Sequence, residues 1–136
     1  MSKGMGAYAR KINELETSVI YEYGGYNLND PEYRNAGHIY DGTIMILKEC
    51  FAEPEIHKKV KKTTSGKKLI IKRIPVDVEY GQMLADGRIV VENCSNCWHT
   101  VMGNLQVDEM ACHLLFYIFR GYQEEGKIPE TIGYNV

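Results

Sequence analysis

Two cysteines and a histidine in the second half of the chain have the spacing of metal ligands. Cys94 and Cys97 form a CxxC motif, and His99 follows two residues later. Structural zinc sites use four nitrogen or sulfur ligands, and two CxxC-type motifs are their usual signature. This chain has one such motif, and Cys112 and His113 would point about 100° apart on a helix. The cysteines therefore allow two interpretations: zinc ligands, or small thiols packed in a turn.

No motif in the chain indicates an enzyme reaction. A redox-active CxxC works at a helix N-terminus, where the helix dipole lowers the thiol pKa, but this one follows a predicted strand. The sequence has no glycine-rich phosphate loop and no HExxH motif. Cysteine, histidine and aspartate are present without a local arrangement that pairs a nucleophile with a base. We therefore predict a binding protein that has no catalytic residues and needs no cofactor.

Two isolated arginines are better candidates for ligand binding. Arg34 lies in a polar loop after Asp30, and Arg120 follows a long apolar stretch of a predicted helix. A guanidinium group can give two parallel hydrogen bonds to a phosphate. It can equally pair with a nearby carboxylate or, near the end of a helix, with the last carbonyl groups. Both arginines are therefore candidates for an anion site, and each has a purely structural alternative.

An aromatic ring and two amides could complete such a site. Trp98 is the only tryptophan, and it lies in a loop-like segment with Asn93 and Asn96. An indole ring can stack on a base, and an asparagine can bind a base edge or a ribose hydroxyl. Core packing of the indole and turn capping by the amides are the alternatives. The ten tyrosines also suit ligand pockets or half-exposed strands.

One short stretch dominates the charge distribution. The formal net charge is −2, yet eight Lys or Arg and no acidic residue lie between Ile56 and Val76. The rest of the chain carries the other eight basic residues and all 18 acidic ones, so its formal net charge is −10. The lysines occur in pairs, so neighbours would point to opposite faces of a hairpin that turns at residues 64–66. A solvated hairpin is one interpretation, and a zinc-stabilised nucleic-acid or protein-binding module is the alternative function.

Hydrophobic periodicity predicts the elements that must position these residues. Strands are expected over 18–26, 38–48, 58–63, 67–74 and 88–93, with one or two helical turns over 78–84. Asn104 or Asp108 can cap a helix that runs to about Glu125 and stops at Gly126, with Pro129 just beyond. Strands followed by one helix predict an α+β fold, an antiparallel sheet of about five strands with a long C-terminal helix packed on it.

The same sequence features predict the domain organisation, the association with other copies and the cellular compartment of the protein. Residues 1–17 are predicted to be flexible or a short helix, and residues 18–136 to form a single α+β domain. The C-terminal helix is apolar nearly all round, which predicts burial on a second side at an oligomer interface. The sequence has neither a secretory signal nor a stretch of about 20 apolar residues, so we expect a cytoplasmic protein that makes no membrane contact.

Five segments together suggest a family. They are Tyr23-Gly-Gly-Tyr-Asn27, Asn29-Asp-Pro-Glu-Tyr-Arg-Asn35, the basic stretch 58–73, Glu92-Asn-Cys-Ser-Asn-Cys-Trp98 and Phe119-Arg-Gly-Tyr122. In combination they resemble the first family of phage Thoeris anti-defence proteins, from about residue 18 to the C-terminus. The resemblance implies a protein that binds the cyclic ADP-ribose signal of a bacterial immune enzyme and sequesters it without cleavage.

The same resemblance implies roles for particular residues. Arg34 and Arg120 would hold the diphosphate, Trp98 would supply the aromatic ring, and Asn93 or Asn96 the amide. The site would lie near a protomer interface of a homodimer or hexamer.

The resemblance also implies a second ligand class. Some family members also take up cyclic di- or trinucleotides at a separate site, for which Lys72 and Arg73 are the candidates in this chain.

Overall fold

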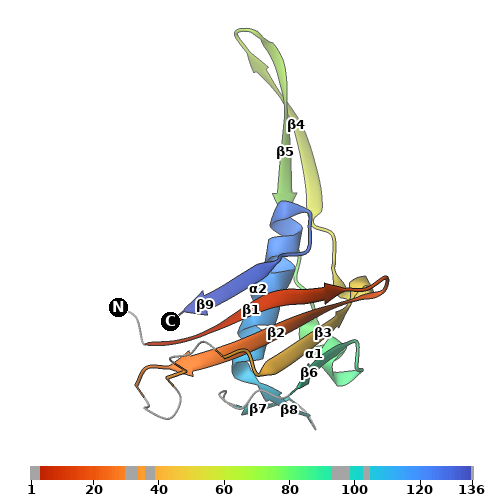
Figure 1. Ribbon diagram of the computed structural model, residues 1–136. Helices are drawn as coiled ribbons and strands as arrows, with labels where there is room; N and C mark the ends of the chain where they lie inside the picture. Colours follow the sequence, from red (N-terminus) through yellow and green to blue (C-terminus); the bar gives the residue numbers. More distant parts are fainter. Residues whose placement is uncertain (1–3, 30–33, 36–38, 93–98, 103–104, 136) are drawn as a thin grey trace.

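An antiparallel sheet of five strands forms the centre of the protein (Figure 1). The computed structural model describes residues 4–29, 34–35, 39–92, 99–102 and 105–135. The sheet has the order β6-β3-β2-β1-β9. Its strands are β1 (Met5–Glu14), β2 (Ser18–Asn27), β3 (Gly42–Leu47), β6 (Ile89–Glu92) and β9 (Thr131–Asn135). The long helix α2 (Glu109–Glu125) packs on one face of the sheet, which confirms the predicted α+β class.

The N-terminal segment differs from its prediction. Residues 5–14 are neither flexible nor helical but form β1, which pairs with β2 on one side and with β9 on the other. Ala7 and Ala9 are buried on the face that carries α2. The local sequence of small residues has little β-propensity, so the strand exists because two neighbouring strands pair with it.

The core lies between the sheet and α2. The sheet contributes the alternating Val19, Tyr21 and Tyr23 of β2 and Ile44 and Ile46 of β3, all completely buried. The helix contributes Met110, Ala111, Leu114, Leu115, Ile118 and Phe119. The alternation of Val19, Tyr21 and Tyr23 follows the period of two of a strand, and Met110, Leu114 and Ile118 follow the helical period of 3.6. The other side of α2 leaves Phe116 and Tyr117 exposed.

The ends of α2 fall close to their predicted positions. The helix begins at Glu109, directly after Asp108, which was one of the two predicted capping residues. It ends at Glu125, and Gly126 follows with a φ of 77°, a left-handed conformation that glycine adopts without steric cost. The Gly126 backbone N–H donates to the Tyr122 carbonyl oxygen at 2.8 Å. The predicted stop signal is therefore confirmed.

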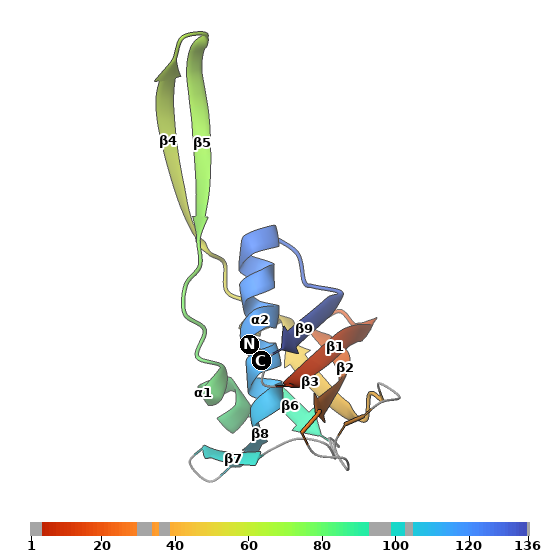
Figure 2. The ribbon, with the colours of Figure 1, turned by 90° about the vertical axis from the view of Figure 1, so that its left-hand side faces the viewer.

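A long hairpin projects from the body of the protein beyond the C-terminal end of α2 (Figures 1 and 2). It consists of β4 (Glu55–Thr63) and β5 (Gly66–Ile74), paired in a two-stranded sheet of their own. The turn lies at Thr64 and Ser65, as predicted. The smaller elements are the helix α1 (Tyr80–Ala85) and a hairpin of β7 (His99–Met102) and β8 (Leu105–Asp108). Among the described residues, no helix is long and apolar enough to span a membrane.

One buried amide ties the base of this hairpin to α2. The Gln123 side chain is 2% exposed, and its oxygen accepts from the Val76 N–H at 2.6 Å. Its amide nitrogen donates to the Val76 carbonyl at 3.0 Å, so one side chain satisfies both backbone groups of the residue after Pro75. Arg73 adds a hydrogen bond from Nε to the Gln123 carbonyl at 3.1 Å, near the C-terminus of the helix, where a cation is favoured.

We expect Gln123→Leu to lower the free energy of unfolding by about 1–2 kcal/mol, because it leaves two backbone groups of Val76 without their partner. Urea denaturation followed by circular dichroism measures the change. Glu125→Leu places the same new side chain at an exposed position of the same helix and should change stability by less than about 0.5 kcal/mol. Equal losses in the two variants would contradict the role given to the amide.

Candidate functional site

The two arginines predicted to share a diphosphate lie on opposite faces of the central sheet. Ala7 and Ala9 of β1 face α2, so Tyr8 between them points to the other face. Arg34 lines a cavity on the face of Tyr8. Arg120 lies on α2, and its Nε is 2.9 Å from Oε1 of Glu124. One chain therefore does not bring the two guanidinium groups together.

The cavity beside Arg34, which we call the tyrosine cavity, is walled by aromatic rings. Its volume is about 550 Å³, and its lining residues are Ala7, Tyr8, Tyr26, Leu28, Arg34, Asn35, Tyr40, Gly133 and Asn135. They come from β1, β2, β9 and the segment that joins β2 to β3. A volume of this size lies within the roughly 300–1,000 Å³ of small-molecule sites.

The Tyr8 ring lies between two other tyrosine rings of the cavity. The rings of Tyr8 and Tyr26 are nearly parallel, with 6.5 Å between their centroids, and Tyr40 meets Tyr8 edge-on at 4.8 Å. The Tyr26 hydroxyl donates to Oδ1 of Asn135, which joins β2 to the last residue of β9. Rings held in this way present fixed aromatic faces and edges, as stacking on a planar ligand requires.

Asn35 fixes the segment that carries Arg34. It has a φ of 50°, a conformation that asparagine tolerates better than most residues. Its Nδ2 donates to the Tyr8 hydroxyl at 2.5 Å and to the Gly25 carbonyl at 3.0 Å, and its Oδ1 accepts from the Ile39 N–H at 2.9 Å. The residue after Arg34 is therefore anchored to two strands and to Ile39.

Two glycines flank Tyr8 in the sheet and shape the cavity. Tyr8 is paired with Gly24 on β2 and with Gly133 on β9, directly across the two strand ladders. A Cβ atom on Gly24 would lie 2.2 Å from the Ile39 carbonyl oxygen and 3.0 Å from the Tyr8 ring, so this position is closely packed. A Cβ atom on Gly133 would meet no atom within 4 Å. The open side of the cavity therefore lies over β9.

A second arginine approaches the same aromatic cluster. The guanidinium carbon of Arg10 lies 4.1 Å from the centre of the Tyr40 ring, and Arg10 also forms an ion pair with Glu22 on β2. The cation lies over the negative face of the ring, where the attraction is worth about 0.5–1 kcal/mol at exposed sites. Arg10 thereby orients Tyr40 and adds positive charge near the cavity.

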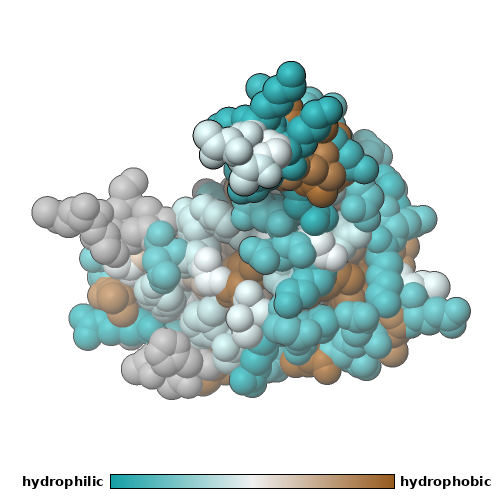
Figure 3. Space-filling view, turned by 90° about the horizontal axis from the view of Figure 1, so that it is seen from above, coloured by the Kyte–Doolittle hydropathy of each residue, from teal (hydrophilic) through white to brown (hydrophobic). Residues whose placement is uncertain are grey.

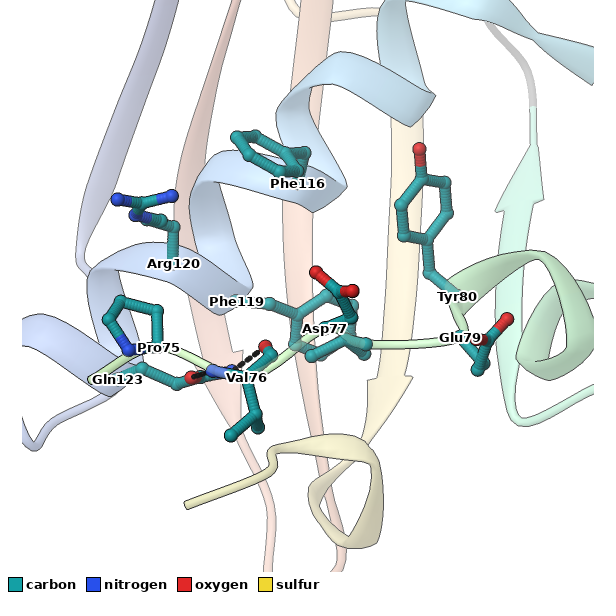
Figure 4. A pocket seen from close by; sticks show the side chains of 10 residues that line it. Pro75, Val76, Asp77, Glu79, Tyr80, Phe116, Phe119, Arg120 and Gln123 are labelled. Atoms are coloured by element: carbon teal, nitrogen blue, oxygen red, sulfur yellow. Dashed lines mark hydrogen bonds between the residues drawn. The ribbon is translucent and has the colours of Figure 1, made fainter. Parts of the chain in front are cut away.

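Arg120 belongs to a different cavity, which we call the helix pocket. It lies between α2 and the segment after β5, has a volume of about 340 Å³ and is shown in Figure 4. Its lining residues are Pro75, Val76, Asp77, Val78, Glu79, Tyr80, Phe116, Phe119, Arg120 and Gln123. Burial raises the pKa of the Tyr80 phenol. The buried Phe119 forms the base of the helix pocket, and the charged side chains of Arg120, Asp77 and Glu79 lie around it.

The two residues predicted for a second phosphate site point to opposite faces of the projecting hairpin. Lys72 pairs with His57 and Arg73 with Ile56 in the β4–β5 ladder, and successive residues of a strand alternate in direction. Both residues are exposed, and Arg73 donates a hydrogen bond to the Gln123 carbonyl near the end of α2.

The remaining predicted site residues cannot be placed. Asn93, Cys94, Asn96, Cys97 and Trp98 lie outside the described residues, and of His99 only the backbone, in β7, is described. Within the described part of the chain, no group of three or more His, Cys, Asp or Glu is placed to hold a metal ion. The zinc interpretation of the CxxC motif therefore stays a prediction.

The tyrosines are the part of the site that sequence reasoning missed. Tyr8, Tyr26 and Tyr40 lie on segments without a common motif; the pairing of β1 with β2 brings the first two together, and Tyr40 joins them from the segment before β3. The ten tyrosines of the chain were the available signal. The fold and the cavity define the class: an α+β protein with a tyrosine-walled cavity on the face of its sheet opposite α2. No protein-family model, curated protein or solved structure matches the chain.

Proposed function

We propose that the protein binds a nucleotide of the cyclic ADP-ribose type in the tyrosine cavity and sequesters it without cleavage, thereby blocking a bacterial anti-phage defence signal. The cavity itself carries the proposal, since it combines three tyrosine rings with the guanidinium group of Arg34. The biological role rests on the sequence resemblance to the Thoeris anti-defence family.

The chemistry of the lining matches the parts of such a ligand. A tyrosine ring stacks on a purine, and a guanidinium group makes charge-assisted hydrogen bonds to a diphosphate. The amides of Asn35 and Asn135 already hold the tyrosine hydroxyls in place, so the wall of the cavity is organised before a ligand arrives. Preorganisation lowers the entropic cost of binding. Among the described residues of the lining there is no carboxylate, histidine or cysteine that could attack or protonate the ligand.

Arg120 can take part in the same site only from another protomer. It lies on the opposite side of the sheet from Arg34, so a diphosphate held by both arginines requires two chains. The cytoplasm of a bacterial host is the compartment that this function requires. Cyclic di- or trinucleotides remain predicted ligands of a separate site at Lys72 and Arg73.

The test is calorimetric titration with cyclic ADP-ribose, with linear ADP-ribose as the comparison. Heat denaturation of the complex should release the cyclic nucleotide intact, as chromatography of the supernatant would show.

Arg34→Ala should weaken binding by at least about tenfold, which corresponds to the loss of one charge-assisted hydrogen bond. Gly133→Leu should block the cavity and leave the melting temperature unchanged, because the new side chain points into open space.

Arg88→Ala is the matched control. Arg88 is paired with Asp86 after α1, away from the tyrosine cavity, so its loss should leave the affinity unchanged. Recovery of a cleaved nucleotide would contradict sequestration. Unchanged affinity in both Arg34→Ala and Gly133→Leu would show that the ligand binds elsewhere.

A further inference from the structure

The projecting hairpin carries most of its aliphatic side chains on one face. The β4–β5 register places four of them on this side, which we call the aliphatic face: Ile56, Val60, Leu69 and Ile71. Val60 pairs directly with Leu69, and Ile71 is the next residue of β5 on the same face, so these side chains are neighbours. All four are 49–59% exposed, and Figure 3, viewed from above the hairpin, shows apolar surface on one of its sides. The chain therefore leaves a contiguous apolar stripe uncovered, which marks a contact surface.

The lysines of the hairpin lie on both faces and are uncompensated. Three share the aliphatic face and four lie opposite: Lys58, Lys62 and Lys67, then Lys59, Lys61, Lys68 and Lys72. Within the described part of the chain, none of the seven makes an ion pair. Two pairs of them, Lys61 with Lys68 and Lys62 with Lys67, lie directly across the ladder, where like charges destabilise a hairpin. An anionic surface placed against the hairpin would remove this repulsion.

The acidic remainder of the chain lies away from the tip of the hairpin. Outside residues 56–76 the formal net charge is −10, so a negatively charged surface would repel the body of the protein. The hairpin projects beyond the end of α2 in both views (Figures 1 and 2). Its nine-residue strands span about 30 Å, well beyond the roughly 8 Å over which exposed charges interact at physiological ionic strength. The tip can therefore reach an anionic surface that the body does not touch.

We infer that the projecting hairpin binds the surface of an anionic lipid membrane. The aliphatic face would lie at the boundary between headgroups and acyl chains, and the lysines would bind the lipid phosphates and carboxylates. Lys62 and Lys67, which share the aliphatic face, can lay their methylene stems along the apolar side chains and keep their ammonium groups among the headgroups. The outer edges of β4 and β5 are unpaired in this two-stranded sheet, so their backbone groups require the hydrated headgroup region and the insertion is shallow.

The aliphatic face favours a membrane over a nucleic acid. Phosphates of a duplex would neutralise the lysines on both faces, but they offer no apolar surface to four half-exposed aliphatic side chains. Residues 55–74 also contain no Phe, Tyr or Trp that could stack on an unpaired base. An anionic bilayer supplies both kinds of contact, because binding at its surface grows with the buried apolar area and with the attraction between cations and lipid headgroups.

This inference differs from the sequence-based expectation of no membrane contact. That expectation rested on the absence of an apolar stretch long enough to span a bilayer. A hairpin that lies in the headgroup region needs no such stretch, since only one of its faces meets the acyl chains. The inference is also independent of the nucleotide proposal, because no hairpin residue lines the tyrosine cavity.

The first test is flotation of the full chain with lipid vesicles. The protein should float with vesicles of phosphatidylcholine that contain about 30% phosphatidylserine, and pure phosphatidylcholine should bind it at least about tenfold more weakly. The anionic lipid provides the charge that the lysines require, so the difference between the two vesicles measures the electrostatic part of binding.

A pair of matched variants tests the apolar part. Val60→Ser, Leu69→Ser should weaken binding to the anionic vesicles by at least about tenfold, because it removes apolar area from the aliphatic face and leaves every lysine in place. Ile12→Ser, Leu15→Ser is the control, since it removes two aliphatic side chains of similar exposure, 52% and 48%, from the acidic body. The control should bind the vesicles as the unmodified protein does. All four positions are exposed, so the circular dichroism spectrum should not change.

Three results would overturn the inference: no binding to anionic vesicles, equal binding to neutral and anionic vesicles, or equal losses in the two double variants. Binding of duplex DNA by a protein that ignores the vesicles would assign the hairpin to nucleic acid instead. Titration of Val60→Ser, Leu69→Ser with cyclic ADP-ribose separates this inference from the proposed function, because the variant should keep the nucleotide affinity of the unmodified protein.

Discussion

Leu114→Ala should lower the free energy of unfolding by about 2–5 kcal/mol, the range for large-to-small changes in a packed core. Leu114 is completely buried on the side of α2 that faces the sheet. The truncation removes apolar surface and leaves a cavity that the rigid strands cannot fill by collapse. A loss of this size would consume a large fraction of the roughly 5–15 kcal/mol that stabilises a typical domain.

Urea denaturation should be compared between Leu114→Ala and Leu15→Ala. The comparison distinguishes the effect of burial on stability from the effect of changing leucine to alanine. Leu15 is 48% exposed in the turn after β1, so the same chemical change there should cost less than about 0.5 kcal/mol. Comparable losses in the two variants would mean that α2 does not pack on the sheet as described. A midpoint shift without a change in the denaturant slope would confirm that only stability has changed.

Gly24→Ala should destabilise the protein by about 1–3 kcal/mol and should also impair nucleotide binding. The new methyl group would lie 2.2 Å from the Ile39 carbonyl oxygen and 3.0 Å from the Tyr8 ring. Because the obstacle is backbone, the segment at Ile39 must move away from β2. That movement breaks the hydrogen bond from the Tyr8 hydroxyl to Ile39 and displaces the ring from the cavity wall.

Gly133→Ala is the control for this variant, because it makes the same change at the other strand neighbour of Tyr8. No atom lies within 4 Å of its new methyl group, so stability should stay within about 0.5 kcal/mol of the unmodified protein. Thermal denaturation and calorimetric titration measure the two effects on each variant. If both glycines tolerate alanine equally, the close approach of Ile39 to β2 does not exist.

The elements that the sequence predicts well are those with a strong local period. Met110, Leu114 and Ile118 repeat at helical spacing, and Gly126 ends the helix by its backbone conformation. Val19, Tyr21 and Tyr23 alternate as a strand buried on one face requires. In each case the signal lies within one window of the chain, so it does not depend on which other segment packs against it.

The parts that escaped prediction depend on contacts between distant segments. β1 consists mostly of small and polar residues, and β9 is short and contains Gly133. Neither strand therefore has the regular apolar–polar alternation that predicts a strand. The pairing of β1 with β9 on one side and with β2 on the other creates the face on which the tyrosine cavity lies. The cross-strand partners in the projecting hairpin, such as Lys61 opposite Lys68, likewise required the observed register.

The pairing of β1 with β9 also sets the order in which the walls of the tyrosine cavity can form during synthesis. Gly6 is paired with Asn135, so the first and last strands of the sheet meet only when the ribosome has released almost the entire described chain. Tyr8 and Tyr26 can come together early, because β1 and β2 are consecutive, whereas Gly133 and Asn135 complete the cavity at the end. A nascent chain that stops before β9 would therefore lack the wall of the tyrosine cavity that Gly133 and Asn135 provide.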